Sequence, residues 1–406
     1  MKKFEIPQHF RSSFTGKVKQ IRRTIDPRKK DWSPTRIEAD KFSFVFPRHM
    51  GFCYGVENAI EIAYKAIQEN PGKRIFLLGE MIHNPAVNED LLSMGVRFIM
   101  DTAGRRLLDW NELNGNDIVI TPAFGTTLEI AAELEQLGVD VKKYNTTCPF
   151  VEKVWKRSHE IGEVGYTIVI HGKYKHEETR ATFSHAQRNA KSIIVRDMKE
   201  AKWIADFVEG RMDEQQFRQL FEGKYSEDFD PNFDFQRIGV VNQTTMLATE
   251  TEEIAAFLKQ VVQSKYGAEA FADTRDTLCY ATNENQMAVM ELLQVPADFS
   301  IVIGGHKSSN TFQLATILNT KMRTYFIEDA TAIEGNIIRH LDLKTMEIRT
   351  DAIDLKENQN SICLVSGASC PDTLVDEVVS KICEVSQVSY QPELWLEEWS
   401  KNLQQL

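Results

Sequence analysis

The sequence repeats one strand-and-helix pattern three times, and this repeat restricts the fold more than any other feature. In each repeat a short apolar run ends in polar residues and is followed by a helix with one apolar face. The first such runs are RIFLLGEMIHNP, YTIVIHGKYKHEE and FSIVIGGHKSSN. Apolar runs that alternate with amphipathic helices are typical of βαβ units. We therefore expect an α/β fold of three pseudo-equivalent domains, each with a small parallel sheet flanked by helices, arranged around a central cavity.

The repeat also predicts where the domains begin and end. The expected ranges are an N-terminal arm at 1–40, three α/β domains at 41–146, 147–276 and 277–392, and a C-terminal tail at 393–406. The second domain is lengthened by an acidic insertion near 203–236, which we expect to lie on the surface with a helix or two. Residues 1–40 are basic and show little apolar periodicity, so we interpret them as a surface arm whose role the sequence leaves open.

Composition excludes several classes of protein. The net charge of −11 leaves no basic footprint for nucleic acid, and no apolar stretch is long enough to span a membrane. Six cysteines among 406 residues do not suggest a disulfide scaffold. We expect a cytoplasmic protein. A plastid location fits less well, because the N-terminal segment contains five acidic residues.

Three cysteines recur at one position of the pattern. Cys53, Cys148 and Cys279 each follow an apolar or extended segment and open an amphipathic helix. Backbone N–H groups and the helix dipole favour a thiolate there. Without short ligand spacings the trio does not resemble a structural zinc site, whereas three thiolates at a shared centre suit an iron–sulfur cluster with one iron left open. The other three cysteines, Cys363, Cys370 and Cys383, are interpreted as structural.

Polar residues gather where the strands end. In open α/β sheets ligands bind beyond the carboxyl ends of the strands. The residues concerned offer many hydrogen-bond donors, which suits a diphosphate at helix N-termini: His83, His176, Ser308, Ser309, Asn310 and Ser369. The alternative for the serines and Asn310 is helix capping, and both roles are compatible.

An acid and a hydroxyl complete the predicted site. Glu178 lies two residues after His176, where a carboxyl group can carry a proton, and Glu177 beside it is expected to be solvated or structural. Thr244 lies at the end of another strand of the same repeat, followed by Thr245, and a hydroxyl there can bind a substrate oxygen and relay a proton.

Eight segments, in order, carry a family resemblance. They are GFCYGVENAI, GEMIHNPAVNEDL, TTCPFVEKVW, HGKYKHEETRAT, NQTTML, TLCYATNENQMA, HKSSNT and SGASCPD. Together they resemble the 4-hydroxy-3-methylbut-2-enyl diphosphate reductase family, the last enzyme of the methylerythritol phosphate route to isoprenoids. The match runs from about Phe42 to Cys383, and the long N-terminal segment is similar to the plant and cyanobacterial branch.

The resemblance implies a detailed chemistry. It makes Cys53, Cys148 and Cys279 the ligands of one 4Fe–4S cluster with one open iron site for the substrate hydroxyl. The His, Ser and Asn residues named above would hold the diphosphate, Glu178 would deliver the proton and Thr244 would assist it. Reductive loss of the hydroxyl would give isopentenyl and dimethylallyl diphosphates, in a ratio that the sequence does not fix. A ferredoxin or flavodoxin would supply electrons to a monomer or homodimer.

One position departs from the common family pattern. Many members have a histidine at the third strand end of the first domain, where this chain has Phe124 within PAFGTT. Phenylalanine cannot bind phosphate, so the pocket must differ there, with Thr126 and Thr127 as the available hydroxyls. Three other interpretations stay open: an iron–sulfur dehydratase that needs no electron donor, a cluster-bearing regulator, and a binding protein with incidental cysteines.

Overall fold

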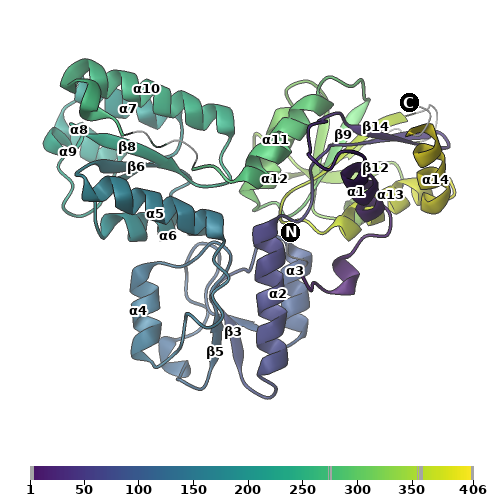
Figure 1. The fold of residues 1–406 in the computed structure, drawn as a ribbon, viewed down its shortest axis with the longest axis horizontal. Coiled ribbons are helices and arrows are strands. Elements are labelled where there is room, and N and C mark those ends of the chain that lie inside the picture. Colours follow the sequence, from purple (N-terminus) through teal and green to yellow (C-terminus); the bar gives the residue numbers. More distant parts are fainter. Residues whose placement is uncertain (1–3, 273, 275–276, 354, 356–359, 404–406) are drawn as a thin grey trace. The chain divides into compact units, whose positions relative to one another are not determined.

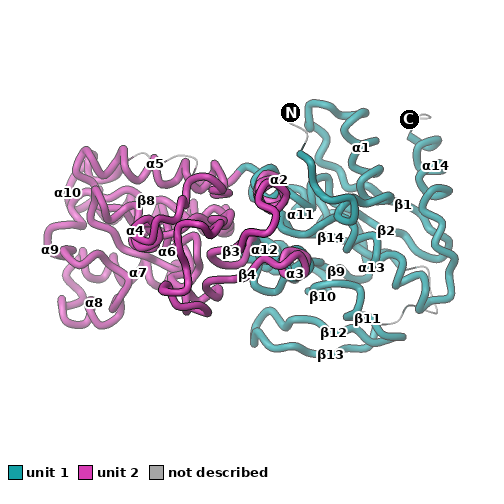
Figure 2. Tube along the Cα trace, turned by 90° about the horizontal axis from the view of Figure 1, so that it is seen from below, with its two compact units in different colours: residues 1–57, 82–88, 280–406 teal, residues 58–81, 89–279 magenta. Residues whose placement is uncertain are grey.

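The computed structural model describes residues 4–272, 274, 277–353, 355 and 360–403 (Figure 1). The chain forms two compact units, coloured separately in Figure 2. Unit 1 contains residues 1–57, 82–88 and 280–406, and unit 2 contains residues 58–81 and 89–279. The three domain ranges expected from the sequence stay a prediction.

Two three-stranded parallel sheets and the parallel part of an eight-stranded mixed sheet share one strand order, and the expected α/β class is confirmed. In each, the first strand of the repeat is central and the other two flank it. The sheets are β3 (Ile75–Leu77) between β4 (Arg97–Phe98) and β5 (Ile118–Ile120), β6 (Thr167–His171) between β7 (Ser192–Val195) and β8 (Ile238–Asn242), and β9 (Phe299–Ile303) between β10 (Thr324–Ile327) and β14 (Asn360–Ser366). Every residue of β6, β8 and β9 is buried, as expected for parallel strands covered on both faces.

Helices complete both units, and unit 1 also contains strands that pair antiparallel. Those of unit 2, including two helices that cross its boundary, are α2 (Tyr54–Glu69), α3 (Pro85–Ser93), α4 (Leu128–Gln136), α5 (Pro149–Glu163), α6 (Glu177–Gln187), α7 (Met198–Val208), α8 (Glu214–Leu220), α9 (Pro231–Asp234), α10 (Ala248–Tyr266) and the 3₁₀ turns Trp110–Glu112 and Ala268–Ala270. Those of unit 1 are α1 (Thr15–Ile25), α11 (Tyr280–Leu292), α12 (Ser309–Leu318), α13 (Asp372–Val385), α14 (Pro392–Leu403), β1 (Thr35–Ala39), β2 (Phe42–Phe46), β11 (Ile333–Glu334), β12 (Ile337–Leu341), β13 (Ile348–Ala352) and the 3₁₀ turns Gln8–Phe10 and Ala330–Ala332. Among the helices described, none is both long and apolar enough to cross a bilayer.

The segments that lead to the cysteines pair with the third strand of a sheet. Before Cys53, β2 runs parallel to β14, with Phe44 opposite Ile362. Before Cys148, Asn145 bridges in parallel to Thr121, next to β5. Before Cys279, Phe271 bridges in parallel to Ile238 of β8. Each cysteine segment is therefore attached to the sheet of the preceding repeat, and the first one is attached to the sheet of the last.

The interpretation of residues 1–40 as a surface arm is wrong for residues 4–40. Strand β1 pairs antiparallel with β2, with Ile37 opposite Phe44. Phe14, Val18 and Ile37 are buried in the main core of unit 1. Phe14 and Val18 are four residues apart, the spacing of one helix face. The many lysines and arginines around them make this short apolar pattern hard to recognise in the sequence.

The expected C-terminal tail is also part of that core. Helix α14 buries Trp395 and Leu396. The ring of Trp395 lies 6.0 Å from that of Phe14 and packs edge-on against it. Helix α14 and the segment around Phe14 thus stabilise each other. No local sequence pattern predicts this contact, because the two residues are far apart in the chain.

The insertion near 203–236 contains the expected helices, and it is also part of a core. Its residues Phe217, Phe221, Phe229 and Phe235 are buried and belong to one apolar cluster with Ile193 of β7 and other residues of unit 2. The phenylalanine rings pack against one another at centroid distances between 4.8 and 6.3 Å. The acidic residues of the insertion therefore cover an aromatic core.

Candidate active site

In unit 1, the loop after β14 joins several of the predicted site residues. The Cys53 N–H donates to the carbonyl oxygen of Ala368 at 3.2 Å, and the Ala368 N–H donates to Asn310 Oδ1 at 2.9 Å. The Ser369 hydroxyl lies 3.3 Å from Ser308 Oγ and 3.4 Å from the carbonyl oxygen of His83. Three segments that are distant in sequence therefore meet at this loop.

A glycine that sequence reasoning missed permits this meeting. A side chain at Gly305 would place its Cβ 2.4 Å from the carbonyl oxygen of His83, too close for any residue but glycine. Gly305 precedes the HKSSNT segment, and the pair of glycines in GGHKSSN after an apolar strand is the signal that could have identified it. The close approach brings the backbone of His83 to the start of α12.

The N-terminus of α12 has the character of an anion site. Ser308 caps the helix by accepting a hydrogen bond from the Thr311 N–H at 3.2 Å. Ser309 and Asn310 are buried, and within the described residues Ser309 Oγ and Asn310 Nδ2 have no hydrogen-bond partner. A buried polar atom without a partner is unfavourable unless a ligand satisfies it. Together with the free N–H groups and dipole of the helix, these two donors suit a phosphate.

In unit 2, Glu178, Thr244 and Cys279 are connected. Glu178 lies in the first turn of α6 and is 1% exposed. Its carboxylate accepts the Thr244 N–H at 2.5 Å and the Thr244 hydroxyl at 3.0 Å. The Thr244 carbonyl oxygen in turn accepts the Cys279 N–H at 3.4 Å. Thr244, two residues beyond β8, thus contacts both the buried acid and the backbone of Cys279.

Thr245, the neighbouring hydroxyl, is engaged elsewhere. Its Oγ1 accepts a hydrogen bond from Gln243 Nε2 at 2.8 Å. Gln243 is fully buried, and its Oε1 also accepts from the Thr179 hydroxyl and from the Lys173 N–H, both at 3.1 Å. Gln243 therefore fixes the loop around Thr244. The one signal that could have identified Gln243 is that an amide directly after an apolar strand needs several hydrogen-bond partners.

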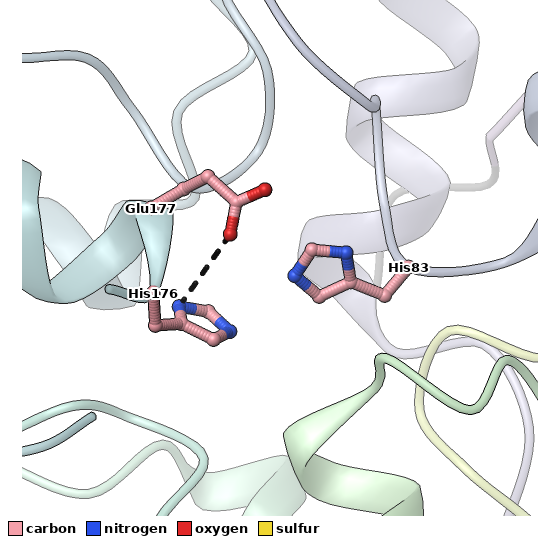
Figure 3. A group of neighbouring side chains, drawn as sticks. All are labelled: His83, His176 and Glu177. Atoms are coloured by element: carbon pink, nitrogen blue, oxygen red, sulfur yellow. Dashed lines mark ion pairs between the residues drawn. The ribbon is translucent and has the colours of Figure 1, made fainter. Parts of the chain in front are cut away.

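His176 caps helix α6 through Nδ1. This atom accepts the Glu178 N–H at 3.2 Å, so in the neutral ring the proton lies on Nε2. The Glu177 carboxylate lies 4.0 Å from the same Nδ1 atom, as Figure 3 shows. The sequence predicts that Glu177 is either solvated or structural. Its side chain is only 13% exposed, so it is not solvated.

Phe124, the position expected to depart from the family pattern, packs beside His176. The two rings meet edge to face with centroids 5.4 Å apart. Of the two nearby hydroxyls, that of Thr127 caps α4 by accepting from the Ile130 N–H at 3.4 Å. At this strand end Phe124 therefore contributes a packing contact with the ring of His176.

The candidate cysteine ligands differ in environment from the other thiols. Burial raises the pKa of the Cys53 thiol, and the backbone N–H groups of Val56 and Gly55 act in the opposite direction. Cys148 is the N-cap of α5, with Pro149 at the first helical position, and Cys279 directly precedes α11. All three lie at helix N-termini, where N–H groups stabilise thiolate or sulfide. All six cysteines are free thiols, so the donor set fits a thiolate-bound iron–sulfur cluster.

The remaining cysteines have the structural role expected of them. Cys363, Cys370 and Cys383 are fully buried. Burial raises the pKa of Cys363 to about 12 and that of Cys383 to about 11, and it raises that of Cys370 well above its usual range. Such thiols stay protonated and pack as small apolar groups.

These features are those of an α/β enzyme with thiols at helix N-termini, a buried acid and unsatisfied buried donors at the start of a helix. The chain matches the LytB protein family over residues 45–383. It belongs to that family.

Relatives with established names agree with this assignment. The chain is 38% identical over 361 residues to the 4-hydroxy-3-methylbut-2-enyl diphosphate reductase of Cyanothece sp. (strain PCC 7425 / ATCC 29141), with 87% of each chain covered. It is 39% identical over 343 residues to the enzyme of the same name from Parasynechococcus marenigrum (strain WH8102), which covers 83% of this chain and 84% of the relative. The family resemblance and its cyanobacterial character are confirmed.

Two solved structures share the fold. One is (E)-4-hydroxy-3-methyl-but-2-enyl diphosphate reductase, the terminal enzyme of the non-mevalonate pathway, with a TM-score of 0.52, 24% identity, and coverage of 84% of this chain and 99% of that chain. The other is the E-1-hydroxy-2-methyl-but-2-enyl-4-diphosphate reductase from Plasmodium falciparum, with a TM-score of 0.60, 19% identity, and coverage of 87% and 96%. At these identities the likeness establishes the fold.

Proposed function

We propose that this protein reduces 4-hydroxy-3-methylbut-2-enyl diphosphate, removing its hydroxyl group to give isopentenyl and dimethylallyl diphosphates. The observation that carries the proposal is the chain of contacts from the Glu178 carboxylate through Thr244 to the backbone of Cys279. Loss of a hydroxyl as water needs a proton donor close to the leaving oxygen. A buried acid bonded to a hydroxyl, beside a thiol ligand, provides that arrangement.

The diphosphate would be bound by neutral donors and helix N-termini. Ser309 Oγ and Asn310 Nδ2 are buried donors at the start of α12, and neither has a hydrogen-bond partner among the described residues. His83, His176, Ser308 and Ser369 would add their side chains to the same ligand. Their hydrogen bonds to a charged group are stronger than those between neutral partners.

Glu178 would hold and deliver the proton. With its carboxyl protonated, one oxygen still accepts from Thr244 while the other donates to the substrate hydroxyl. The Thr244 hydroxyl would orient that substrate oxygen and pass the proton on. Burial at 1% exposure keeps bulk water from competing for it.

The cofactor is the second part of the proposal. Enzymes of this family are iron–sulfur proteins, and we infer that Cys53, Cys148 and Cys279 hold one 4Fe–4S cluster with one open iron site. When bound, the cluster would supply electrons and a Lewis-acidic position for the substrate. A ferredoxin or flavodoxin would reduce it, in a monomer or homodimer. The helix N-termini at the three thiols support this choice of ligands.

Anaerobic purification tests both parts. Iron and acid-labile sulfide are counted, and the brown protein is then given the hydroxylated diphosphate and a chemical reductant. We expect about four irons and four sulfides per chain, and formation of both diphosphate products only when reductant is present. Turnover without reductant would identify a dehydratase instead, and a colourless protein without product formation would contradict the proposal.

A further inference from the structure

The N-terminal segment of unit 1 contacts the loop that carries Cys53 at several points. Here the N-terminal segment means residues 4–33 and the Cys53 loop means residues 47–54. Aromatic rings meet first: Phe4 packs edge-on against Tyr54 at 4.9 Å, and Phe10 against Phe52 at 6.0 Å. These two loop residues directly flank Cys53. The N-terminal segment therefore contacts both the residue before Cys53 and the residue after it.

Charged groups make the second set of contacts. Arg48 of the loop is 8% exposed, and its Nη2 donates to the carbonyl oxygen of Asp26 at 3.2 Å and lies 3.6 Å from the Asp26 carboxylate. Lys19 of α1 pairs with Asp372, and a Cβ at Gly51 would collide with that pair. A buried arginine is costly unless it is paired, so these contacts fix the path of the loop.

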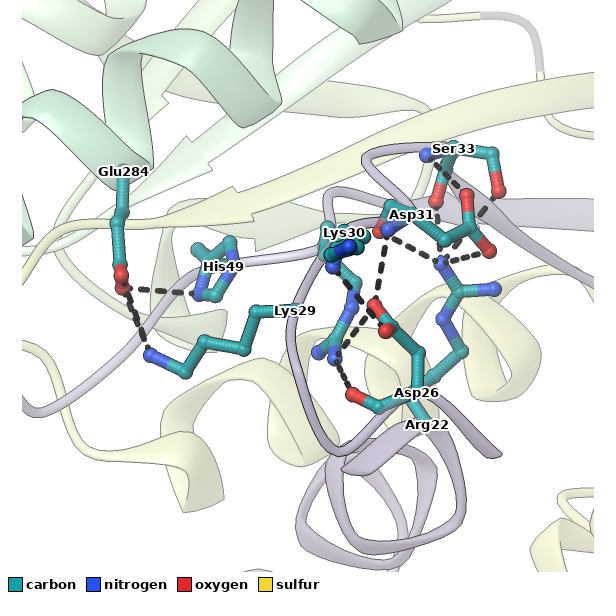
Figure 4. Close-up of polar contacts among 9 residues, drawn as sticks. Arg22, Asp26, Lys29, Lys30, Asp31, Ser33, His49 and Glu284 are labelled. Carbon is teal, nitrogen blue, oxygen red and sulfur yellow. Dashed lines mark hydrogen bonds and ion pairs between the residues drawn. The ribbon is translucent and has the colours of Figure 1, made fainter. Parts of the chain in front are cut away.

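The third set of contacts centres on Glu284 (Figure 4). Its carboxylate lies 3.3 Å from His49 Nδ1 of the loop and 3.0 Å from Lys29 Nζ of the N-terminal segment. The ring of Trp32 covers His49 at 5.1 Å. Glu284 belongs to α11, the helix that begins one residue after Cys279. The Glu284 carboxylate thus contacts both the N-terminal segment and the Cys53 loop. The helix that carries it directly follows Cys279, a second candidate ligand.

Lys29 is held in place for this contact. Its φ of +52° lies in the left-handed region, which residues other than glycine seldom adopt. The Asp26 carboxylate stabilises the turn by accepting the N–H groups of Lys30 and Asp31 at 3.1 and 2.9 Å. The turn therefore keeps a strained backbone that directs Lys29 toward Glu284.

We propose that the N-terminal segment is a clamp on the Cys53 loop, and that Glu284, with Lys29 and His49, is a positioning residue for the Cys53 ligand. The importance of this clamp for the cluster rests on the proposed function, whereas the effect of the clamp on the Cys53 loop does not. The clamp holds the Cys53 N–H against Ala368, so that the thiol has one fixed position whether or not iron is bound.

The test compares four variants of the 406-residue protein. Lys29→Met and Glu284→Gln remove the charge pair, while Lys29→Arg keeps it. Lys381→Met is the matched control, because Lys381 forms a 2.8 Å pair with Glu384 in the same unit but on α13. Hydrogen exchange of the 47–54 amides is measured in each, and so is the rate at which an iron chelator bleaches the cluster.

The clamp predicts local loosening. In Lys29→Met and Glu284→Gln, we expect the amides of 47–54 to exchange about tenfold faster and the cluster to bleach faster by a similar factor, as loss of a charge-assisted hydrogen bond would give. Lys29→Arg and Lys381→Met should behave like the unchanged protein. Unaltered exchange in the first two variants, or an equal increase throughout unit 1, would overturn the clamp. A colourless parent protein would count against the proposed cofactor, and the exchange rates would still decide the clamp.

Discussion

The Glu178 carboxylate accepts two hydrogen bonds from a single residue, Thr244, one from its N–H and one from its hydroxyl. The neighbouring Thr245 is bonded to Gln243 instead. Two adjacent threonines thus have different partners, and only the first adjoins the buried acid. This difference allows the acid–hydroxyl pair to be tested with controls of the same residue type.

Glu178→Gln should bind substrate and turn it over poorly. The amide keeps the shape of the side chain and can still accept a hydrogen bond, but it cannot deliver a proton. We expect kcat to fall by about 10²- to 10⁴-fold with KM changed far less. Steady-state kinetics with a chemical reductant measure this, and near-normal kcat would remove Glu178 from the proton path.

Thr244→Val should lower kcat, whereas Thr245→Val should not. Valine preserves the shape of threonine and removes only the hydroxyl, so the first variant leaves Glu178 without one of its donors. We expect a loss of about tenfold or more, the value of a hydrogen bond to a charged group. Equal effects of the two substitutions would show that the contact with Glu178 is not what matters.

Asn310→Asp should weaken binding of the diphosphate. The new carboxylate can still accept the Ala368 N–H that Asn310 Oδ1 accepts, so the loop is retained. It removes the buried Nδ2 donor and adds a negative charge beside an anion, and we expect KM to rise by about tenfold to a hundredfold. Asn319→Asp, at the other end of α12, is the control. An unchanged KM for Asn310→Asp would place the diphosphate elsewhere.

Serine substitution should separate the ligand thiols from the packing thiols. Cys53→Ser, Cys148→Ser and Cys279→Ser should each lose most of the bound iron and the brown colour, because the hydroxyl is a poor iron ligand. Cys383→Ser, at a fully buried position, should keep the iron while the thermal midpoint falls. Iron content and absorption spectra decide, and a full, active cluster in any of the first three variants would exclude that cysteine as a ligand.

Stability should fall as the pH drops through mild acid. His171 is fully buried with Nδ1 bonded to the Thr251 hydroxyl at 3.0 Å, and burial lowers its pKa to about 4. The unfolded chain has the ordinary value near 6.5. Below about pH 6.5 the unfolded state therefore binds a proton that the folded state does not bind until about pH 4. This histidine alone would account for up to about 3 kcal/mol of stability lost across that interval.

Thermal midpoints of the metal-free protein between pH 7.5 and about 4.5 measure this loss. His171→Gln should show a smaller decrease over that range than the unchanged protein. His159→Gln, at a half-exposed position, is the control for the effect of a histidine-to-glutamine substitution on the thermal midpoint. An identical decrease in the His171 variant would assign the loss to other groups.

Much of the fold was predictable because its elements are local. Apolar runs of the right length, followed by capped amphipathic helices, predict strands β6, β8 and β9 and the helices after them. The same positions identified Ser308 as a cap and Cys148 as a helix start. The ordered motifs indicated the family, which the comparisons confirm.

The α/β class, the family and the residues at strand ends could be predicted from the amino-acid sequence, since each of these depends on periodicity or on short ordered motifs. The strand that each segment joins and the side chains that meet could be known only from the folded chain. Pairing of β2 with β14, burial of Phe14 against Trp395, and the contact of Glu284 with His49 each join residues hundreds of positions apart. Strand and side-chain partners of this kind depend on the packing of the whole core, which no local sequence pattern can predict.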